Sequence, residues 1–184
     1  MNKIKILVMI SLYTLLSSSS CGRDENNDDK LSLAKIAYNG NELRIDGYYC
    51  NYYYVDGKSD PRGITPFFLY KNGVIFGYVG SRVDRIDELE ESFRNGEYVK
   101  TAEKYQWGVF QIEGSKIKYE KWATSEGPYR AFTYEGTILN DTTFVINKSY
   151  RAKDAGKKDP SEHHWEFHFK QFSPKPDSTN RFIP

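Results

Sequence analysis

The sequence predicts one all-β, mainly antiparallel domain: about eight strands closed as an up-and-down barrel or forming a strongly curved sheet, with one short helix. From about residue 35 the chain contains short runs in which apolar and polar side chains alternate, which is the period of a strand. Turn sequences rich in Gly, Asn and Asp separate these runs by a few residues, as in hairpins. Aromatic residues, which have high β propensity, make up 16% of the chain.

The first 20 residues have the composition of an export signal. Lys3 and Lys5 precede an apolar run over residues 6–16, which is followed by four serines and Cys21. A bilayer-spanning helix needs about 20 apolar residues, whereas a signal core needs about 7 to 15. We therefore expect residues 1–20 to be cleaved off. Cleavage by ordinary signal peptidase is one alternative, and it would leave Cys21 as a free thiol.

The other alternative comes from residues 16–21, which resemble the lipobox of bacterial lipoproteins. In that motif small residues precede a cysteine that is acylated and becomes the first residue of the mature chain. Ser18 departs from the usual pattern, where leucine is common. The resemblance implies lipidation of Cys21, and two or more acyl chains are enough for stable anchoring in a membrane.

Four carboxylates follow the cysteine, and they resemble the acidic signal that sends lipoproteins of Bacteroidetes-type bacteria to the outer face of the outer membrane: Asp24, Glu25, Asp28 and Asp29. The resemblance implies an exported protein, lipid-anchored in the outer membrane and exposed at the cell surface. A solvated linker without a receptor is the alternative interpretation. Residues 21–34 show no periodic apolar pattern, so we predict a lipidated Cys21 followed by a flexible acidic spacer.

Residues 35–184 then form a single β domain with an extended tail. About 150 residues can bury about 68 to 70% of their unfolded surface around one core. The 26 Lys and Arg nearly balance the 25 Asp and Glu, which argues against the basic footprint of a nucleic-acid partner. Two cysteines are too few for a disulfide framework. Cys50 can form a bridge only if Cys21 is not lipidated.

Alternation predicts the first strand over residues 42–55, with Gly47 marking a bulge or bend. The next two strands, 65–71 and 74–80, flank Asn72-Gly73, the two-residue sequence of a type I′ turn in which both residues adopt positive φ. The pairs expected in that register are Leu69 with Phe76, Phe67 with Tyr78, and Tyr70 with Ile75.

The apolar period then changes to that of a helix. Val83, Ile86, Leu89 and Phe93 recur at helical spacing among acidic residues, and Asn95-Gly96 supplies a stop. Strands return after residue 105, and their predicted ranges are 107–112, 116–122, 129–139, 142–150 and 162–172. The tail contains three prolines, so we expect it to be extended, with Phe182 and Ile183 docking on the domain.

Eight strands joined by hairpins close most simply as a barrel, which removes exposed edges. The interior of such a barrel is filled by side chains or holds one small ligand. Gly47-Tyr48-Tyr49 resembles the G-x-W motif of lipocalins, with Tyr49 at the Trp position. The domain is thus similar to the lipocalin-like domain of small Bacteroidetes-type surface lipoproteins. It departs from lipocalins in the position of its helix, which follows the third strand.

The aromatic content leads to the main functional prediction, a non-enzymatic binding module for a small apolar or aromatic ligand or for a glycan. Tyrosine offers apolar area with a polar group, and the chain has 15 Tyr and 11 Phe. Aromatic residues that only build the sheet are the alternative. The candidate ligand-binding residues are Tyr49, Tyr53, Phe67, Leu69, Phe76 and Tyr78.

The last predicted strand contains all 3 histidines of the chain. Period two places His164, Glu166 and His168 on one face of this strand. Histidine nitrogen and carboxylate oxygen are ligands of Zn²⁺, so these three residues are the candidate metal ligands. A polar face turned to solvent is the alternative interpretation.

The chain has no nucleophile-elbow sequence, P-loop or cysteine with an evident activating partner, so we predict neither an enzyme nor a cofactor. A hydrolase would need converging carboxylates such as Asp46, Glu120 or Glu135, whose separation in space decides that chemistry. The other alternative is a structural or interaction subunit of an outer-membrane complex. The expected partners are therefore the membrane, a small ligand or glycan, and an envelope protein.

Overall fold

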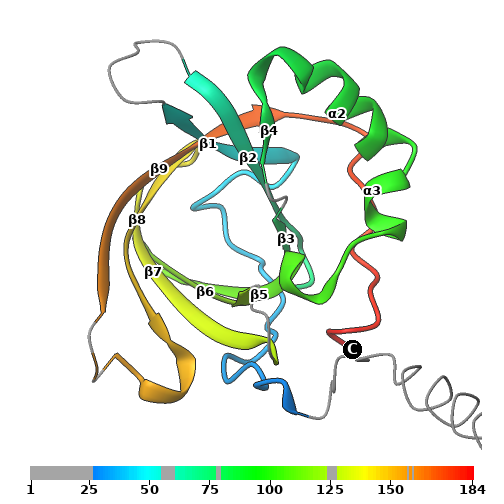
Figure 1. Cartoon of the computed structure of the whole chain (residues 1–184). Helices are drawn as coiled ribbons and strands as arrows, with labels where there is room; N and C mark the ends of the chain where they lie inside the picture. Colours follow the sequence, from blue (N-terminus) through cyan, green and yellow to red (C-terminus); the bar gives the residue numbers. More distant parts are fainter. Residues whose placement is uncertain (1–26, 55–60, 78–79, 124–127, 157, 159) are drawn as a thin grey trace, which may run out of the picture.

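The structure, a computed structural model, describes residues 27–54, 61–77, 80–123, 128–156, 158 and 160–184. In these residues eight antiparallel strands close into a barrel, in the order β1-β9-β8-β7-β6-β5-β3-β2, with β2 pairing back to β1 (Figure 1). The strands are β1 (Gly47–Tyr54), β2 (Pro61–Leu69), β3 (Val74–Gly77), β5 (Trp107–Glu113), β6 (Lys116–Ala123), β7 (Arg130–Asn140), β8 (Thr143–Arg151) and β9 (Ser161–Gln171). A two-residue strand, β4 (Ser81–Arg82), pairs with β2 beyond β3. The predicted eight-stranded barrel is confirmed.

The turn between β2 and β3 differs from the predicted two-residue type. The Tyr70 amide donates to the carbonyl of Val74, which leaves three residues in the turn, and of these only Gly73 has a positive φ, of 82°. The Asn72 side chain instead accepts a hydrogen bond from the Val74 amide at 3.2 Å, so this asparagine does not need positive φ. The observed pairs are Phe67 with Gly77, Phe68 with Phe76 and Leu69 with Ile75. The predicted register is wrong by one residue, which moves Phe76 to the outer face of the barrel.

The barrel interior holds one apolar core. Its buried members come from all eight strands of the barrel, including Ile117 and Tyr119 of β6 and Phe167 of β9. Tyr38 and Leu43, from the segment that precedes β1, belong to the same core and close one end of the barrel. The first strand therefore begins at Gly47 and not at residue 42, since residues 42–46 cross that closed end.

A second core lies outside the barrel, beneath a helical segment that covers one side of it (Figure 1). The segment comprises η2 (Val83–Arg85), α2 (Ile86–Arg94) and α3 (Glu97–Lys100), and it ends near η3 (Lys104–Gln106). Leu89 and Phe93 of α2 pack onto outward-facing Phe68 and Phe76. The predicted helix is present, and Gly96 with a φ of 71° follows its last turn as expected. A further 3₁₀ turn, η4 (Ala152–Asp154), follows β8.

Residues 27–34 of the predicted flexible spacer lie fixed on the outside of the barrel. The carboxylate of Asp28 accepts from the Tyr129 amide at 2.6 Å and pairs with Lys104 at 2.9 Å. Further along, the amides of Ser32 and Leu33 donate to the buried carboxylate of Glu120. Residues 27–34 of the predicted spacer are therefore bound to the barrel, which offers buried partners to their polar groups. Residues 1–26, which include the predicted signal and Cys21, lie outside the described residues.

The C-terminal tail docks on the barrel, as predicted. Phe182 and Ile183 pack against the outer core. The Lys175 ammonium donates to the carbonyls of Ile45 and Leu69 at 2.7 and 2.6 Å, which fixes the start of the tail. No helix within the described part of the chain is long and apolar enough to cross a bilayer.

Candidate functional site

The two ends of the barrel differ. At one end, Tyr38 and Leu43 cover the apolar core. At the other end β1, β6 and β8 finish and β2, β7 and β9 begin, and we call this end the mouth. Because side chains alternate along a strand, the register shows which residues near the mouth point inward. The inward-facing residues lie on the same strand faces as three core residues, Tyr49 of β1, Tyr119 of β6 and Phe167 of β9.

Three inward-facing side chains stand next to one another on adjacent strands of the mouth. Lys121 on β6 pairs with Phe132 on β7, and Phe132 pairs with Arg151 on β8. One layer deeper, the same three strands pair Tyr119 with Tyr134 and Tyr134 with Ser149. We call these two rows, Lys121-Phe132-Arg151 above Tyr119-Tyr134-Ser149, the mouth site. A lysine and an arginine thus occupy the strand positions on either side of Phe132, above a layer that contains two tyrosines.

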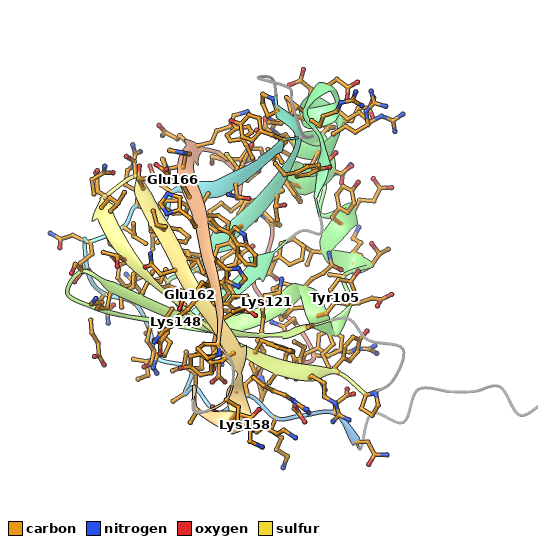
Figure 2. The ribbon with its side chains drawn as sticks, turned by 60° about the vertical axis from the view of Figure 1, so that its left-hand side comes forward. Tyr105, Lys121, Lys148, Lys158, Glu162 and Glu166 are labelled. Atoms are coloured by element: carbon orange, nitrogen blue, oxygen red, sulfur yellow. The ribbon has the colours of Figure 1, made fainter. Side chains whose placement is uncertain are left out.

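Two glycines lie beside the Lys121 side chain. Figure 2 labels this lysine. A Cβ atom on Gly108 of β5 would lie 2.9 Å from Cβ of Lys121, and one on Gly77 of β3 would lie 3.2 Å from its Nζ. The lysine side chain therefore crosses the inner face of β5 and brings its amine toward β3. A Cβ atom on Gly108 would also lie only 2.2 Å from the Glu120 carbonyl oxygen, so the close approach of β6 to β5 itself requires glycine here.

No acidic side chain among the described residues pairs with the amine of Lys121. Burial lowers the pKa of this amine to about 8, and no other group shifts it. Part of the residue stays accessible to solvent. No described carboxylate or carbonyl forms a hydrogen bond with it. An isolated buried ammonium is unfavourable unless an anion pairs with it or it loses its proton.

Arg151 is only partly paired. Its Nη2 donates to a carboxylate oxygen of Asp29 at 3.1 Å, whereas its Nε is buried and finds no partner among the described residues. Asp29 is shared, since Arg130 lies 3.2 Å from its other oxygen. Burial opposes ionisation of the Asp29 carboxyl, but its hydrogen bonds outweigh this effect and hold its pKa below the usual value. The mouth site therefore carries more positive than negative charge on its described residues.

A path of aromatic rings leads from the core to solvent at the mouth. Phe67 in the core lies 5.0 Å from the ring of Tyr119, which stacks on Tyr134 at 4.6 Å. Tyr134 in turn lies 6.2 Å from Trp165, whose side chain is 39% exposed. The His163 ring stacks on Trp165 at 3.9 Å, and its Nε2 lies 2.7 Å from the Ser149 hydroxyl. This wall offers flat apolar surface beside the two cations.

The six candidate ligand residues fall into three environments. Tyr49, Phe67 and Leu69 are buried in the core, and the Tyr49 hydroxyl is satisfied by carbonyl oxygens. Tyr53 lies inward at the mouth, and its ring fills the space where a Cβ of Gly63 would stand. Phe76 packs on the outer face beneath α2, contrary to the predicted pairing with Leu69. Tyr78 lies outside the described residues. Of the five described residues in this set, the structure thus places only Tyr53 at the mouth.

The three candidate metal ligands lie on the outer face of β9. His168 Nε2 lies 3.5 Å from Glu166 Oε1, and His164 is exposed. Across the part of the chain that the structure describes, no group of three or more His, Cys, Asp or Glu side chains is arranged to hold a metal ion. The arrangement matches a polar face turned to solvent.

The carboxylates considered for hydrolysis are all engaged elsewhere. Asp46 pairs with Arg44 at 2.6 Å, and Glu120 accepts hydrogen bonds from the segment before β1. Burial raises the pKa of the Glu135 carboxyl, but hydrogen bonds led by that from Lys148 outweigh this and lower it to about 2. Cys50 is buried as a free thiol, and burial raises its pKa. Neither a carboxylate pair nor an activated thiol faces the mouth site within the described residues.

A surface hollow of about 600 Å³ lies away from the barrel interior, between the segment Val99–Lys104 and the C-terminal tail. Two of its polar groups are already paired. Lys104 pairs with Asp28, and the Tyr129 hydroxyl donates to Glu103 at 3.0 Å. The mouth site, with its uncompensated amine, is therefore the better candidate.

The residues that define the mouth site were not identified from the sequence. The available indication was the run 117, 119, 121, where Ile117 and Tyr119 share one strand face with Lys121. A lysine on an apolar face near a strand end is a recognisable pattern. Comparisons of the chain with protein-family models, curated proteins and solved structures find no match.

Proposed function

We propose that this protein is an exported, lipid-anchored envelope protein that binds a small amphipathic anion at the mouth of its barrel. The observation that carries the proposal is the Lys121 amine, which points into the barrel without a counter-charge among the described residues. Lipidation of Cys21, inferred from the sequence, supplies the anchor.

The mouth site offers complementary groups for both parts of such a ligand. A carboxylate or phosphate beside the Lys121 amine, which lies toward β3, would form a charge-assisted hydrogen bond with it. The apolar or aromatic body would lie on the wall formed by Tyr119, Tyr134 and Trp165. The deeper core is tightly packed with side chains, so we expect the ligand to occupy the mouth half only.

The charge of the site narrows the ligand class predicted from the sequence. A neutral glycan or a purely apolar molecule would bury the Lys121 ammonium without pairing it, which costs free energy. An anion removes this penalty. We therefore favour amphipathic anions over neutral ligands of the same shape, and binding requires no chemical step.

The proposal is tested with a fatty acid and the alcohol of the same chain length. Binding of dodecanoate and dodecanol to the full chain in mild detergent is measured by calorimetry. A charged hydrogen bond contributes about 1.5–3 kcal/mol, so we expect the acid to bind about tenfold more tightly or better. Lys121→Met should abolish this preference.

Lys116→Met is the matched control, because Lys116 lies on the same strand and is exposed on its outer face. This variant should keep the preference for the acid. Equal affinity for acid and alcohol in the unmodified protein, or the same loss in both variants, would contradict the proposal. Mass spectrometry of the N-terminal peptide separately tests the acylation of Cys21.

A further inference from the structure

We infer that the mouth of the barrel faces the membrane, so that the site exchanges its ligand with a lipid surface. This inference rests on the proposed lipid anchor at Cys21. It goes beyond the proposed function because it assigns a surface of the barrel to a partner, the bilayer.

The first argument is the point at which the chain reaches the barrel. Asp28 is bonded to the amide of Tyr129, directly before β7, and Asp29 pairs with Arg151 at the end of β8. Both places belong to the rim of the mouth. The chain then runs along the outside of the barrel, where Glu120 holds Ser32, toward the closed end. The anchored end of the protein is therefore at the mouth.

The second argument is length. Five residues lie between Cys21 and Asn27, and the six steps of extended chain that join them span at most about 20–22 Å. β7 has 11 residues, which is about 36 Å of strand, and a barrel tilt of about 35–45° leaves a height of about 25–30 Å. The tether is thus shorter than the barrel, so the closed end cannot rest on the membrane that holds Cys21.

The third argument is the kind of side chain exposed at each end. Tyr53, Tyr54 and Trp165 are exposed by 47%, 58% and 39%; the two tyrosines end β1 at the rim of the mouth, and Trp165 lies on the inner wall below it, paired with Ile146. Tyrosine and tryptophan are the residues enriched at membrane–water interfaces. The exposed large apolar residues described at the closed end, Ile36 and Leu139, are aliphatic. The mouth therefore has the surface chemistry of an interfacial contact.

Charge at the mouth contributes less than the aromatic residues. Arg62, Lys153 and Lys158 are exposed there, and Figure 2 shows Lys158 and Glu162 where β9 begins. Glu162 and Asp154 offset part of the positive charge. We therefore assign the contact chiefly to Tyr and Trp side chains at the lipid headgroups.

The test uses the full acylated protein in phosphatidylcholine vesicles whose acyl chains are brominated near the headgroup, because bromine quenches tryptophan at short range. Trp165 is exposed, whereas Trp107 and Trp122 are buried. We expect brominated vesicles to quench the wild-type protein and to have little effect on Trp165→Phe. Replacing both Tyr53 and Tyr54 by Ser should weaken the quenching, and replacing Ile36 and Leu139 by Ser should not.

The outcomes separate this inference from the proposed function. Protein that stays on washed vesicles but shows no quenching of Trp165, or equal quenching in Trp165→Phe, would overturn the orientation alone. Protein that washes off the vesicles would overturn the anchor and the orientation together. Neither result alters the comparison of dodecanoate with dodecanol in detergent, which tests the ligand site without a bilayer.

Discussion

The two halves of the barrel interior are built from the same strands but have opposite character. In the closed half, rings such as Phe144 and Phe167 stack at 4.8 Å and are removed from water. In the mouth half, Lys121, Phe132 and Arg151 occupy the corresponding inward positions. The closed half is formed by side chains that satisfy one another. In the mouth half, the Lys121 amine and the Arg151 Nε have no partner among the described residues, and we interpret that difference as the proposed division between stability and binding.

The largest expected loss of stability comes from a substitution in the closed half. Phe144→Ala removes a fully buried ring and should lower the free energy of unfolding by about 3–5 kcal/mol. Phe132→Ala, at a partly accessible inward position of the mouth, should cost clearly less. Urea denaturation followed by circular dichroism measures both. Equal losses would mean that the two halves do not differ in packing.

Glu90 is a buried charge with partners, so its removal should lower stability, unlike removal of the Lys121 amine. Glu90 on α2 is buried and accepts hydrogen bonds from Tyr48 at 2.7 Å and from Lys170 at 2.6 Å. Glu90→Gln should therefore destabilise the protein by about 1–3 kcal/mol. Burial raises the pKa of this carboxyl, but its hydrogen bonds outweigh burial and lower it.

The sign of the pH effect follows from that lowered pKa. The stabilisation from Glu90 is present above the usual pKa of 4.5 and is lost as the pH falls through the lower folded value. The unfolding free energies of wild type and Glu90→Gln should converge in acid. A constant difference down to strongly acidic pH would show that the pair contributes no charge interaction.

Most substitutions of buried residues lower the free energy of unfolding, and Lys121→Met should not. Removal of an uncompensated amine should leave stability at neutral pH unchanged or raise it, while the preference for anionic ligands is lost. Since the pKa falls from 10.5 to about 8 on folding, the unfolded chain holds more protons between these values. The wild type should therefore gain stability relative to the variant as the pH rises from about 8 to 10.5.

That comparison isolates one lysine. Burial also lowers the pKa of Lys175 to about 8, but Lys175 is the same in both proteins, so its contribution cancels in the difference. Denaturation curves at several pH values measure the effect. A difference that does not change with pH over this interval would mean that the Lys121 amine is not desolvated.

The smallest expected effect on stability is at the mouth. Tyr53→Ser should change the unfolding free energy by about 1 kcal/mol or less, because the side chain is largely exposed. It should weaken dodecanoate binding without removing the preference for the acid. Tyr49→Ser is the matched variant on the same strand face, and it should unfold far more easily, since Tyr49 is buried in the core. Similar stability of the two variants would contradict the division into halves.

Strand number, the position of the helix and the docking of the tail followed from local patterns in the sequence, because alternation and turn residues act over a few positions. The β2–β3 register did not follow, since Asn72 satisfies the turn with its side chain and only Gly73 takes positive φ. That one-residue shift was enough to misplace Phe76. The fixed position of residues 27–34 also escaped prediction, because their partners, such as Glu120 and Tyr129, are distant in sequence.

The candidate site illustrates the same limit. Tyr53 was selected as an aromatic residue on the correct face, but its neighbours at the mouth come from strands far along the chain. Lys121, Phe132 and Arg151 become adjacent only through the pairing of β6, β7 and β8. Pairing across strands depends on register, and bulges such as that between Ile146 and Lys148 shift it by one residue. A pattern in one strand predicts the inward face but not the residues beside it.

Closure of the barrel also determines when the protein could fold during the export that we propose. The ring is completed where Tyr49 of β1 pairs with Phe169 of β9, near the two ends of the described chain. The hydrogen bond from the Ser32 amide likewise cannot form until Glu120, 88 residues later in the chain, is present. Such long-range pairings form late, because a long loop has to close before they can contribute. A chain that is threaded through a membrane from its N-terminus would therefore stay without a finished barrel until almost its whole length has emerged, which is the state that passage through a narrow channel requires.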